Sequence, residues 1–216
     1  MADLEFFFDA VCPWAWVTSR WVEEVRTLRS YEVEWRFISL KMINQDRTDD
    51  WYTPRYRDVH MAGLYVHRVA DEVRQQLGNE GVGSLYAACG TAFHNQQRRE
   101  EITAAPEVFM VEMLTTAGLP TALAAHVHDE SHDAYVQAET ELAFSRTGKD
   151  VGTPIITFHP GTDAEASFFG PVIARIPRGD EALRYCLRVS RRIGAGEIPK
   201  SGHWVLLTEQ VFFGLF

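Results

Sequence analysis

The sequence is poor in cysteine, in basic residues and in long apolar runs. Its three cysteines, Cys12, Cys89 and Cys186, are an odd number at wide spacing, which argues against a disulfide framework. With 21 Lys and Arg against 30 Asp and Glu, the net charge of -9 excludes the basic surfaces that nucleic acids and anionic membranes require. No apolar run approaches the roughly 20 residues of a membrane helix.

The amino-terminal residues also lack the features of a secretory signal. Residues 1–5 have no basic start followed by an apolar core, and the chain enters a strand-like segment almost at once. Together with the few cysteines, this predicts a cytoplasmic protein with reduced thiols. A length of 216 residues, with 46% hydrophobic residues, suits one folded domain with a sizeable core or a domain that carries a large insertion.

The most informative stretch is a strand-like segment that turns into a helix at a cysteine. Residues 4–8 are mostly apolar, as in a buried strand, and Pro13 opens a segment whose apolar residues recur at helical spacing up to Leu28. Cys12 therefore lies at a helix start, where free N–H groups and the helix dipole favour the thiolate. We expect Cys12 to be a nucleophile with a lowered pKa rather than a buried apolar residue.

Further elements follow in an order that predicts an α/β fold. Residues 31–37 alternate apolar with charged side chains, which predicts a strand with one wet face at or near a sheet edge. A strand, a crossover helix and a second strand form a right-handed unit with parallel strands. Two more strands are predicted at residues 154–158 and 166–169, and a last helix at 179–193.

The long segment between these halves is rich in helix and has no linker-like composition. Helices or helix pairs are predicted at residues 55–77, 84–98, 106–117 and 121–146. They are separated by breaks, the first of which is the glycine-containing segment 78–81.

Cys12-Pro13-Trp14, placed after a strand, resembles the active site of the thioredoxin superfamily, in particular its DsbA-like branch. In that branch the pattern is Cys-x-x-Cys, an attacking sulfur followed one turn later by a resolving sulfur. This chain departs from the pattern, because Ala15 stands where the second cysteine would be.

The resemblance implies an α/β, thioredoxin-like fold with an inserted all-helical subdomain. The core would comprise residues 1–40 and 150–193, and the helical insertion residues 41–149. The tail, residues 194–216, would dock on the body. The family also carries a cis-proline opposite the cysteine, and Thr153-Pro154 has the form of that element.

Other segments narrow the resemblance to one group within the branch. They are Trp16 to Trp21, Ser39-Leu40, His94-Asn95-Gln96, Asp150 to Pro154, Phe168 to Val172 and Ile176 to Gly179. As a set, these segments resemble the actinobacterial DsbA-family proteins known as mycothiol-dependent nitroreductases. The resemblance implies a site that exchanges with mycothiol and reduces nitroaromatic compounds.

By position, the resemblance also implies a set of site residues. Cys12 would be the nucleophile, flanked by Pro13, with Trp14 as a wall of the pocket. Thr153 and Pro154 would face the sulfur. The residues that would face the substrate are Asn44 and Tyr56, and His94 is a further candidate that could orient substrate or stabilise an anion near the thiolate.

Ala15 removes the internal resolving sulfur and so decides the expected mechanism. A single thiolate can attack a disulfide or an electrophile and hold the product as an adduct, so release requires a second small thiol. We therefore expect a monothiol oxidoreductase with mycothiol or a similar thiol as cosubstrate and no tightly bound cofactor. Two alternatives stay open: a kappa-type glutathione transferase or isomerase, in which residue 12 activates a bound thiol, and a redox-inactive module that binds thiols or peptides.

The remaining candidates carry less weight. His126, His128 and His132 include the i, i+4 pair that metals use, but neighbouring acidic residues indicate a solvated helix face, so no metal site is expected. Cys89 and Cys186 are expected to be small buried side chains. We expect a small-molecule or disulfide substrate and no nucleic-acid or membrane partner, with the oligomeric state open between monomer and homodimer.

Overall fold

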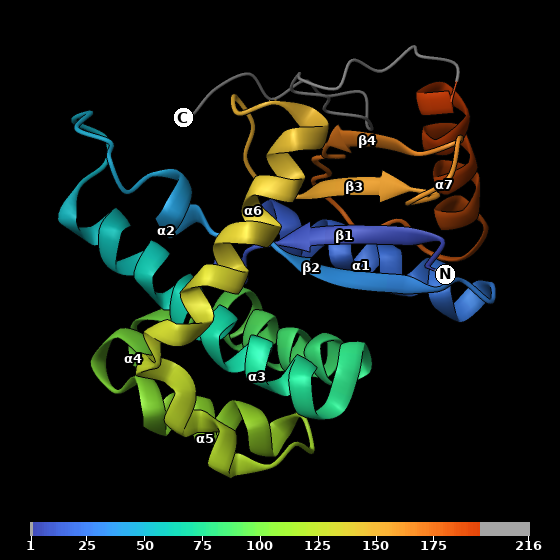
Figure 1. Ribbon diagram of the computed structural model, residues 1–216. Coiled ribbons are helices and arrows are strands. Elements are labelled where there is room, and N and C mark those ends of the chain that lie inside the picture. The colour runs from blue at the N-terminus through green and yellow to red at the C-terminus, as the bar shows by residue number, and fades with distance from the viewer. Residues whose placement is uncertain (1, 195–216) are drawn as a thin grey trace.

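The computed structural model describes residues 2–194, which form a four-stranded mixed sheet surrounded by helices (Figure 1). The strand order is β2-β1-β3-β4. β1 (Leu4–Phe8) pairs in parallel with β2 (Val33–Phe37) and antiparallel with β3 (Ile155–Phe158), which pairs antiparallel with β4 (Ala166–Phe169). The predicted thioredoxin-like α/β fold is confirmed, and β2 lies at an edge, as its alternating pattern predicted.

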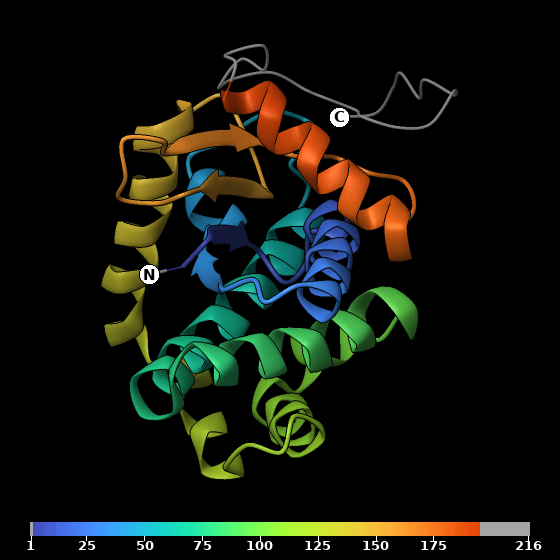
Figure 2. The same cartoon turned by 90° about the vertical axis from the view of Figure 1, so that its right-hand side faces the viewer.

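Helices cover both faces of the sheet. α1 (Pro13–Leu28) packs against α7 (Gly179–Gly194) on one face, and α6 (Asp133–Thr147) crosses the opposite face (Figure 2). The face that carries α1 is aromatic: the Phe8 ring stacks on that of Tyr86 with centroids 3.9 Å apart. This aromatic core continues to the carboxyl end of β1, where Cys12 follows.

The face under α6 is held by buried charges instead. Glu5 is 4% exposed and accepts hydrogen bonds from Arg36, at 2.7 Å, and from Arg146. Arg36 also donates to Glu139 on α6 at 2.6 Å. Because a buried charge is costly unless it is paired, these ion pairs explain how an acidic residue occupies an otherwise apolar strand.

The segment between β2 and β3 is helical. Before α6 it contains α2 (Leu40–Ile43), α3 (Pro54–Gly90), the π-helical turn η1 (Thr91–Asn95), α4 (Arg99–Ala104), α5 (Pro106–Thr116), and the 3-10 helices η2 (Thr121–His128) and η3 (Glu130–His132). This position of the helices confirms the DsbA-like insertion. The exact limits 1–40, 41–149 and 150–193 stay a prediction, and residues 195–216 of the predicted docked tail lie outside the described residues.

The insertion divides at two places. The break predicted at residues 78–81 is confirmed, because Gly78, whose φ is 74°, separates two helical segments within α3. Residues 121–146, predicted as a helix or a helix pair, divide at Asp129, whose carboxylate accepts the backbone N–H of Ser131 and so starts a new turn.

The interruption of α3 has a structural role at the sheet edge. Gly78 adopts the left-handed backbone that glycine tolerates best, and the next residue, Asn79, reaches β2. The Asn79 side chain accepts a hydrogen bond from the backbone N–H of Trp35 at 2.8 Å and donates one to the Val33 carbonyl at 2.7 Å. An edge strand such as β2 leaves backbone N–H and C=O groups unpaired, and the Asn79 side chain bonds two of these groups as a neighbouring strand would. Within residues 2–194, no helix has the length and apolarity that spanning a bilayer demands.

Candidate functional site

Cys12 lies between β1 and the first turn of α1, as predicted. It is the N-cap residue of α1, and Pro13 occupies the first helical position. The sulfur accepts a hydrogen bond from the Ala15 N–H at 3.5 Å and donates one to the Thr153 carbonyl at 3.3 Å. Two backbone groups, 3 and 141 residues away in sequence, therefore hold a thiol that is 6% exposed.

The loop that faces the sulfur is anchored on both sides. The Thr153–Pro154 peptide bond is cis, as predicted. The Thr153 hydroxyl donates to the Phe7 carbonyl on β1 at 3.2 Å, and the Pro154 carbonyl accepts from the Gly170 N–H at 2.8 Å. These bonds fix the Thr153 carbonyl against Cys12.

The expected lowering of the Cys12 pKa is wrong for this closed arrangement. Burial raises the pKa of the Cys12 thiol to about 12. The hydrogen bond from the Ala15 N–H lowers this pKa, the negative charge of Asp9 raises it, and the guanidinium of Arg99 lowers it. The rise in pKa caused by burial of the sulfur is larger than the lowering caused by the helix terminus. The site at rest therefore holds a protonated thiol, which donates to the Thr153 carbonyl.

Asp9 fixes the turn that leads into Cys12. Its side chain is 0% exposed and accepts from the Val11 N–H at 3.1 Å and from the Leu40 N–H, at the start of α2, at 2.8 Å. α3 approaches closely here, because a Cβ at Gly63 would lie 2.3 Å from an Asp9 carboxylate oxygen. The insertion thus packs directly on the charge that acts on the thiol.

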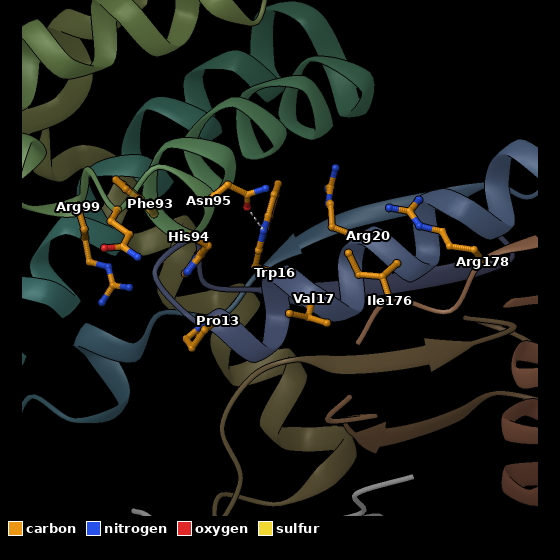
Figure 3. Close-up of a pocket in the computed structure, with 11 residues that line it drawn as sticks. Pro13, Trp16, Val17, Arg20, Phe93, His94, Asn95, Arg99, Ile176 and Arg178 are labelled. Atoms are coloured by element: carbon orange, nitrogen blue, oxygen red, sulfur yellow. Dashed lines mark hydrogen bonds between the residues drawn. The ribbon is translucent and has the colours of Figure 1, made fainter. Parts of the chain in front are cut away.

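A cleft of about 550 Å³ opens beside Pro13 (Figure 3). It is lined by Pro13, Trp16, Val17 and Arg20 of α1, Phe93, His94 and Asn95 of η1, and Gln97, Arg99, Ile176 and Arg178. Figure 3 shows Arg99 at one end of the cleft and Arg178 at the other. The lining therefore offers apolar surface together with three guanidinium groups, which suits a small organic ligand with polar acceptor atoms.

Trp16 forms the aromatic wall of this cleft. Its indole N–H donates to Asn95 at 2.9 Å, and its ring stacks on that of His94 with centroids 5.9 Å apart. The Arg20 guanidinium lies 4.2 Å from the centre of the Trp16 ring, a cation–π contact. These contacts fix the Trp16 ring, which is 5% exposed, at the inner side of the cleft.

His94, a predicted site candidate, lines the cleft and supports the turn before Cys12. Its Nε2 lies 2.9 Å from the Ala10 carbonyl. Burial lowers the pKa of His94 to about 4, so the ring is neutral at neutral pH and Nε2 carries the proton that it donates to Ala10. This bond links η1 to the turn that presents the thiol.

The other predicted substrate residues lie outside the residues that line the cleft. Trp14, directly after Pro13, is 40% exposed, and Tyr56 is 51% exposed with its ring edge-on to that of Trp51. Asn44 is 6% exposed, and its amide bonds the Leu40 carbonyl and the Arg47 guanidinium at 2.9 and 2.8 Å. Their roles toward substrate stay predictions.

The charged residues of the site were not predicted from the sequence. Arg20, Arg99, Arg178 and Asp9 belong to no local motif, and they converge through tertiary packing. Arg20 lies off the apolar stripe of α1, and the helical pattern alone does not indicate whether such a residue faces solvent or a cleft.

No second sulfur resolves Cys12 among residues 2–194, where all three cysteines are free. Ala15 is fully buried, in contact with the core. Cys89 is buried and Cys186 partly buried, broadly as expected, and burial raises the pKa of both thiols.

Comparisons with known proteins agree with this geometry. Residues 11–194 match the family model "Rv2466c-like", described as mycothiol-dependent nitroreductase Rv2466c. The uncharacterized protein Rv2286c of Mycobacterium tuberculosis is 26% identical over 185 residues, which cover 85% of this chain and 74% of the relative.

Two solved structures share the fold. A putative protein disulfide isomerase from Nitrosomonas europaea superposes with a TM-score of 0.57 at 16% identity, covering 88% of this chain and 97% of that chain. A probable DsbA oxidoreductase, SCO1869, from Streptomyces coelicolor superposes with a TM-score of 0.56 at 15% identity, covering 98% of this chain and 96% of that chain. At these identities the likeness is one of fold.

Proposed function

Because the chain belongs to the Rv2466c-like family of mycothiol-dependent nitroreductases, we propose that it is a monothiol oxidoreductase with mycothiol or a similar small thiol as cosubstrate. The observation that carries the proposal is the position of the Cys12 sulfur, at the first turn of α1 and against the carbonyl that precedes cis-Pro154. The proposed substrates are disulfides, nitroaromatic compounds and related electrophiles, and the proposed compartment is the cytoplasm.

The proposed cycle consists of two thiol–disulfide exchanges at one sulfur. The Cys12 thiolate attacks a substrate disulfide, so that a mixed disulfide with one half of the substrate forms and the other half leaves as a thiol with the proton that Cys12 gives up. A molecule of the small cosubstrate thiol then attacks the mixed disulfide, regenerates Cys12 and departs as a disulfide with the bound half of the substrate. With Ala15 in the position of a resolving sulfur, this external thiol is required.

A nitroaromatic substrate fits the same electron balance. Two thiols supply two electrons and two protons and become one disulfide, while the nitro group becomes a nitroso group and releases water. Arg20 and Arg178, which line the cleft, offer hydrogen-bond donors to the oxygen atoms of the nitro group.

The residues around Cys12 define how the thiol is activated. The bond from the sulfur to the Thr153 carbonyl holds the proton in the resting site, and an incoming sulfur must replace this carbonyl. The Ala15 N–H and the Arg99 charge then act in favour of the thiolate. Activation accompanies substrate entry in this proposal, because the raised pKa at rest leaves little thiolate at neutral pH.

Mass spectrometry and turnover test the proposal together. After incubation with oxidised mycothiol, the protein should carry one thiol adduct on Cys12, and Cys12→Ser should carry none. With mycothiol as the only thiol and a nitroaromatic acceptor, we expect turnover that falls at least about 100-fold in Cys12→Ser, because the nucleophile is lost. No adduct on Cys12 and undiminished turnover in Cys12→Ser would overturn the monothiol cycle.

One observation favours a kappa-type glutathione transferase as a second candidate. The Cys12 thiol acts as a hydrogen-bond donor in a buried site that raises its pKa, and a serine hydroxyl could fill a donor's role toward a bound thiol. In that case Cys12→Ser should keep most of the transferase activity with glutathione, and Cys12 should stay unmodified during turnover.

A further inference from the structure

A second group of polar side chains lies in the helical insertion, on elements that do not carry Cys12. Glu72 comes from α3, His126 from η2 and His132 from η3, and one donor atom of each lies within 4.8 Å of the other two. η2 and η3 both pack on α3 (Figure 1). Together with Asp129, which lies between the two histidines, these residues are called the histidine–carboxylate cluster.

The donor atoms of the cluster have the spacing of metal ligands. His126 Nδ1 lies 3.1 Å from His132 Nε2, and Glu72 Oε2 lies 3.9 and 3.7 Å from these two nitrogens. Asp129 Oδ2 lies 3.5 and 3.8 Å from the same nitrogens. Ligand bonds of about 2.0–2.2 Å in a tetrahedral zinc site separate neighbouring ligand atoms by about 3.3–3.6 Å.

Second partners orient the donors toward one point. His132 Nδ1 lies 2.7 Å from a carboxylate oxygen of Asp71, so Nδ1 carries the proton and the Nε2 lone pair faces the cluster. Glu72 receives a hydrogen bond from Gln76 on Oε1 at 2.6 Å, which leaves Oε2 toward the histidines. A carboxylate that accepts from a ligand histidine, as Asp71 does, is a common outer partner in metal sites.

The turn at Asp129 brings the two histidines together. Its Oδ1 accepts the Ser131 N–H at 3.0 Å, while Oδ2 faces the histidines. By the i, i+4 spacing noted in the sequence, His128 and His132 would be the neighbours. The break pairs His126 with His132 instead, and the expected solvated face is wrong for His132, which is 5% exposed.

We propose that Glu72, His126 and His132 bind one divalent transition-metal ion. Two imidazole nitrogens and one carboxylate oxygen are donors that Zn(II) accepts. Because the three ligands come from α3, η2 and η3, the bound ion has a structural role: it ties η2 and η3 to α3. This site is independent of the chemistry at Cys12.

Metal titration of the full chain tests the proposal. Chelator-treated protein should bind Zn(II) with a stoichiometry of one ion per chain in calorimetry, and its melting temperature should rise on addition of zinc. Co(II) should give the visible absorption of a tetrahedral nitrogen–oxygen site, and Zn(II) should displace it. Repeating the titration in Cys12→Ser should give the same stoichiometry, which excludes the thiol as the ligand.

Matched variants locate the ion. Glu72→Gln keeps the size of the side chain and should weaken zinc affinity at least tenfold, and His126→Ala should weaken it as much or more. His128→Ala is the control, because His128 is an exposed neighbour on the same turn outside the cluster. The proposal is overturned if the parent protein binds no zinc, or if the first two variants bind it as tightly as His128→Ala.

Discussion

The Cys12 site and the histidine–carboxylate cluster are built in opposite ways. Backbone groups hold the sulfur of Cys12, namely the Thr153 carbonyl and the Ala15 N–H. In the cluster, by contrast, side chains from three elements face one another, and side chains such as Asp71 orient them. Backbone geometry at a strand-to-helix junction follows from a short local pattern, whereas the convergence of side chains depends on tertiary packing.

Substitutions should therefore have different effects in the two regions. Around Cys12, the charges of Asp9 and Arg99 act on the sulfur, and Asp9 also accepts hydrogen bonds that fix the turn before it. Replacements of similar shape that remove only the charge should therefore change reactivity while the thiol keeps its position. In the cluster, each side chain is itself a donor, so its replacement should remove the proposed site.

Ala15→Cys should have the largest effect, because it places a second sulfur where the backbone alone now contacts Cys12. Positions 12 and 15 lie one helical turn apart, and the Ala15 N–H already bonds the Cys12 sulfur. Oxidation of the parent should stop at a mixed disulfide or a sulfenic acid on Cys12. The variant should instead lose two hydrogens, release the small thiol and show a two-electron reduction potential by mass spectrometry and redox titration.

Ala15→Ser is the matched control for this variant. It has nearly the same size and the same backbone N–H, but no second sulfur, so it should keep the adduct on Cys12. A stable adduct and no internal disulfide in Ala15→Cys would contradict the geometry of the strand–Cys–Pro–helix junction.

Gly63→Ala tests the close packing of the α3 backbone against Asp9, next to Cys12. The new Cβ would lie 2.3 Å from the Asp9 carboxylate, which must then leave its bonds to the Val11 and Leu40 N–H groups. We expect a loss of about 1–3 kcal/mol in the free energy of unfolding, measured by urea denaturation. Gly152→Ala is the control, since the nearest atom to its Cβ is 3.9 Å away, and equal losses in both variants would contradict the close packing at Gly63.

The core of the fold was predictable because its signals are local. The alternation in residues 31–37 identified an edge strand, and Cys12-Pro13 identified the helix start at the sulfur, whereas Thr153-Pro154 on its other side was implied by the family resemblance. Glu5, in contrast, looked like an interruption of an apolar strand, because its partner Arg146 lies 141 residues away. Long-range ion pairs leave no periodic pattern in the sequence.

The charge balance at Cys12 was unpredictable for the same reason. The helix terminus that favours a thiolate is visible as Cys-Pro, but the burial that opposes it comes from tertiary packing, which includes the approach of the Thr153 carbonyl and of α3 at Gly63. Likewise, the turn at Asp129 pairs His126 with His132, although the helical i, i+4 spacing indicated His128 and His132. Tertiary packing overrides local propensity at both positions.

Asp9→Asn and Arg99→Gln should change the reactivity of Cys12 in opposite directions. Asp9 raises the pKa of the thiol and Arg99 lowers it, so alkylation by iodoacetamide at pH 8 should speed up about tenfold in the first variant and slow down in the second. In the parent, the rate should keep rising with pH toward 12. A plateau near 8.5 in the parent, or changes of the same sign in both variants, would contradict the buried-thiol arrangement.

The same raised pKa has a consequence for stability. A Cys12 pKa raised from 9.0 to about 12 means that the unfolded chain ionises first. The contribution of the protonated thiol to stability is therefore complete below pH 9.0 and is lost as the pH rises toward 12. Cys12→Ser should reduce this part of the alkaline decline in the free energy of unfolding.

His94→Phe should have the smallest effect, and it tests whether side chains at the cleft act as acids or bases. The variant keeps a ring against Trp16 but loses the bond to the Ala10 carbonyl, so we expect KM to rise a few-fold and stability to fall by about 1 kcal/mol. Because burial lowers the pKa of His94 to about 4, the ring is already neutral throughout the range from pH 6 to 8. The pH profiles of kcat/KM for parent and variant should then run parallel over this range. An inflection near pH 6.5 that disappears in His94→Phe would show instead that His94 exchanges protons during turnover, and that a side chain as well as the backbone governs the thiol.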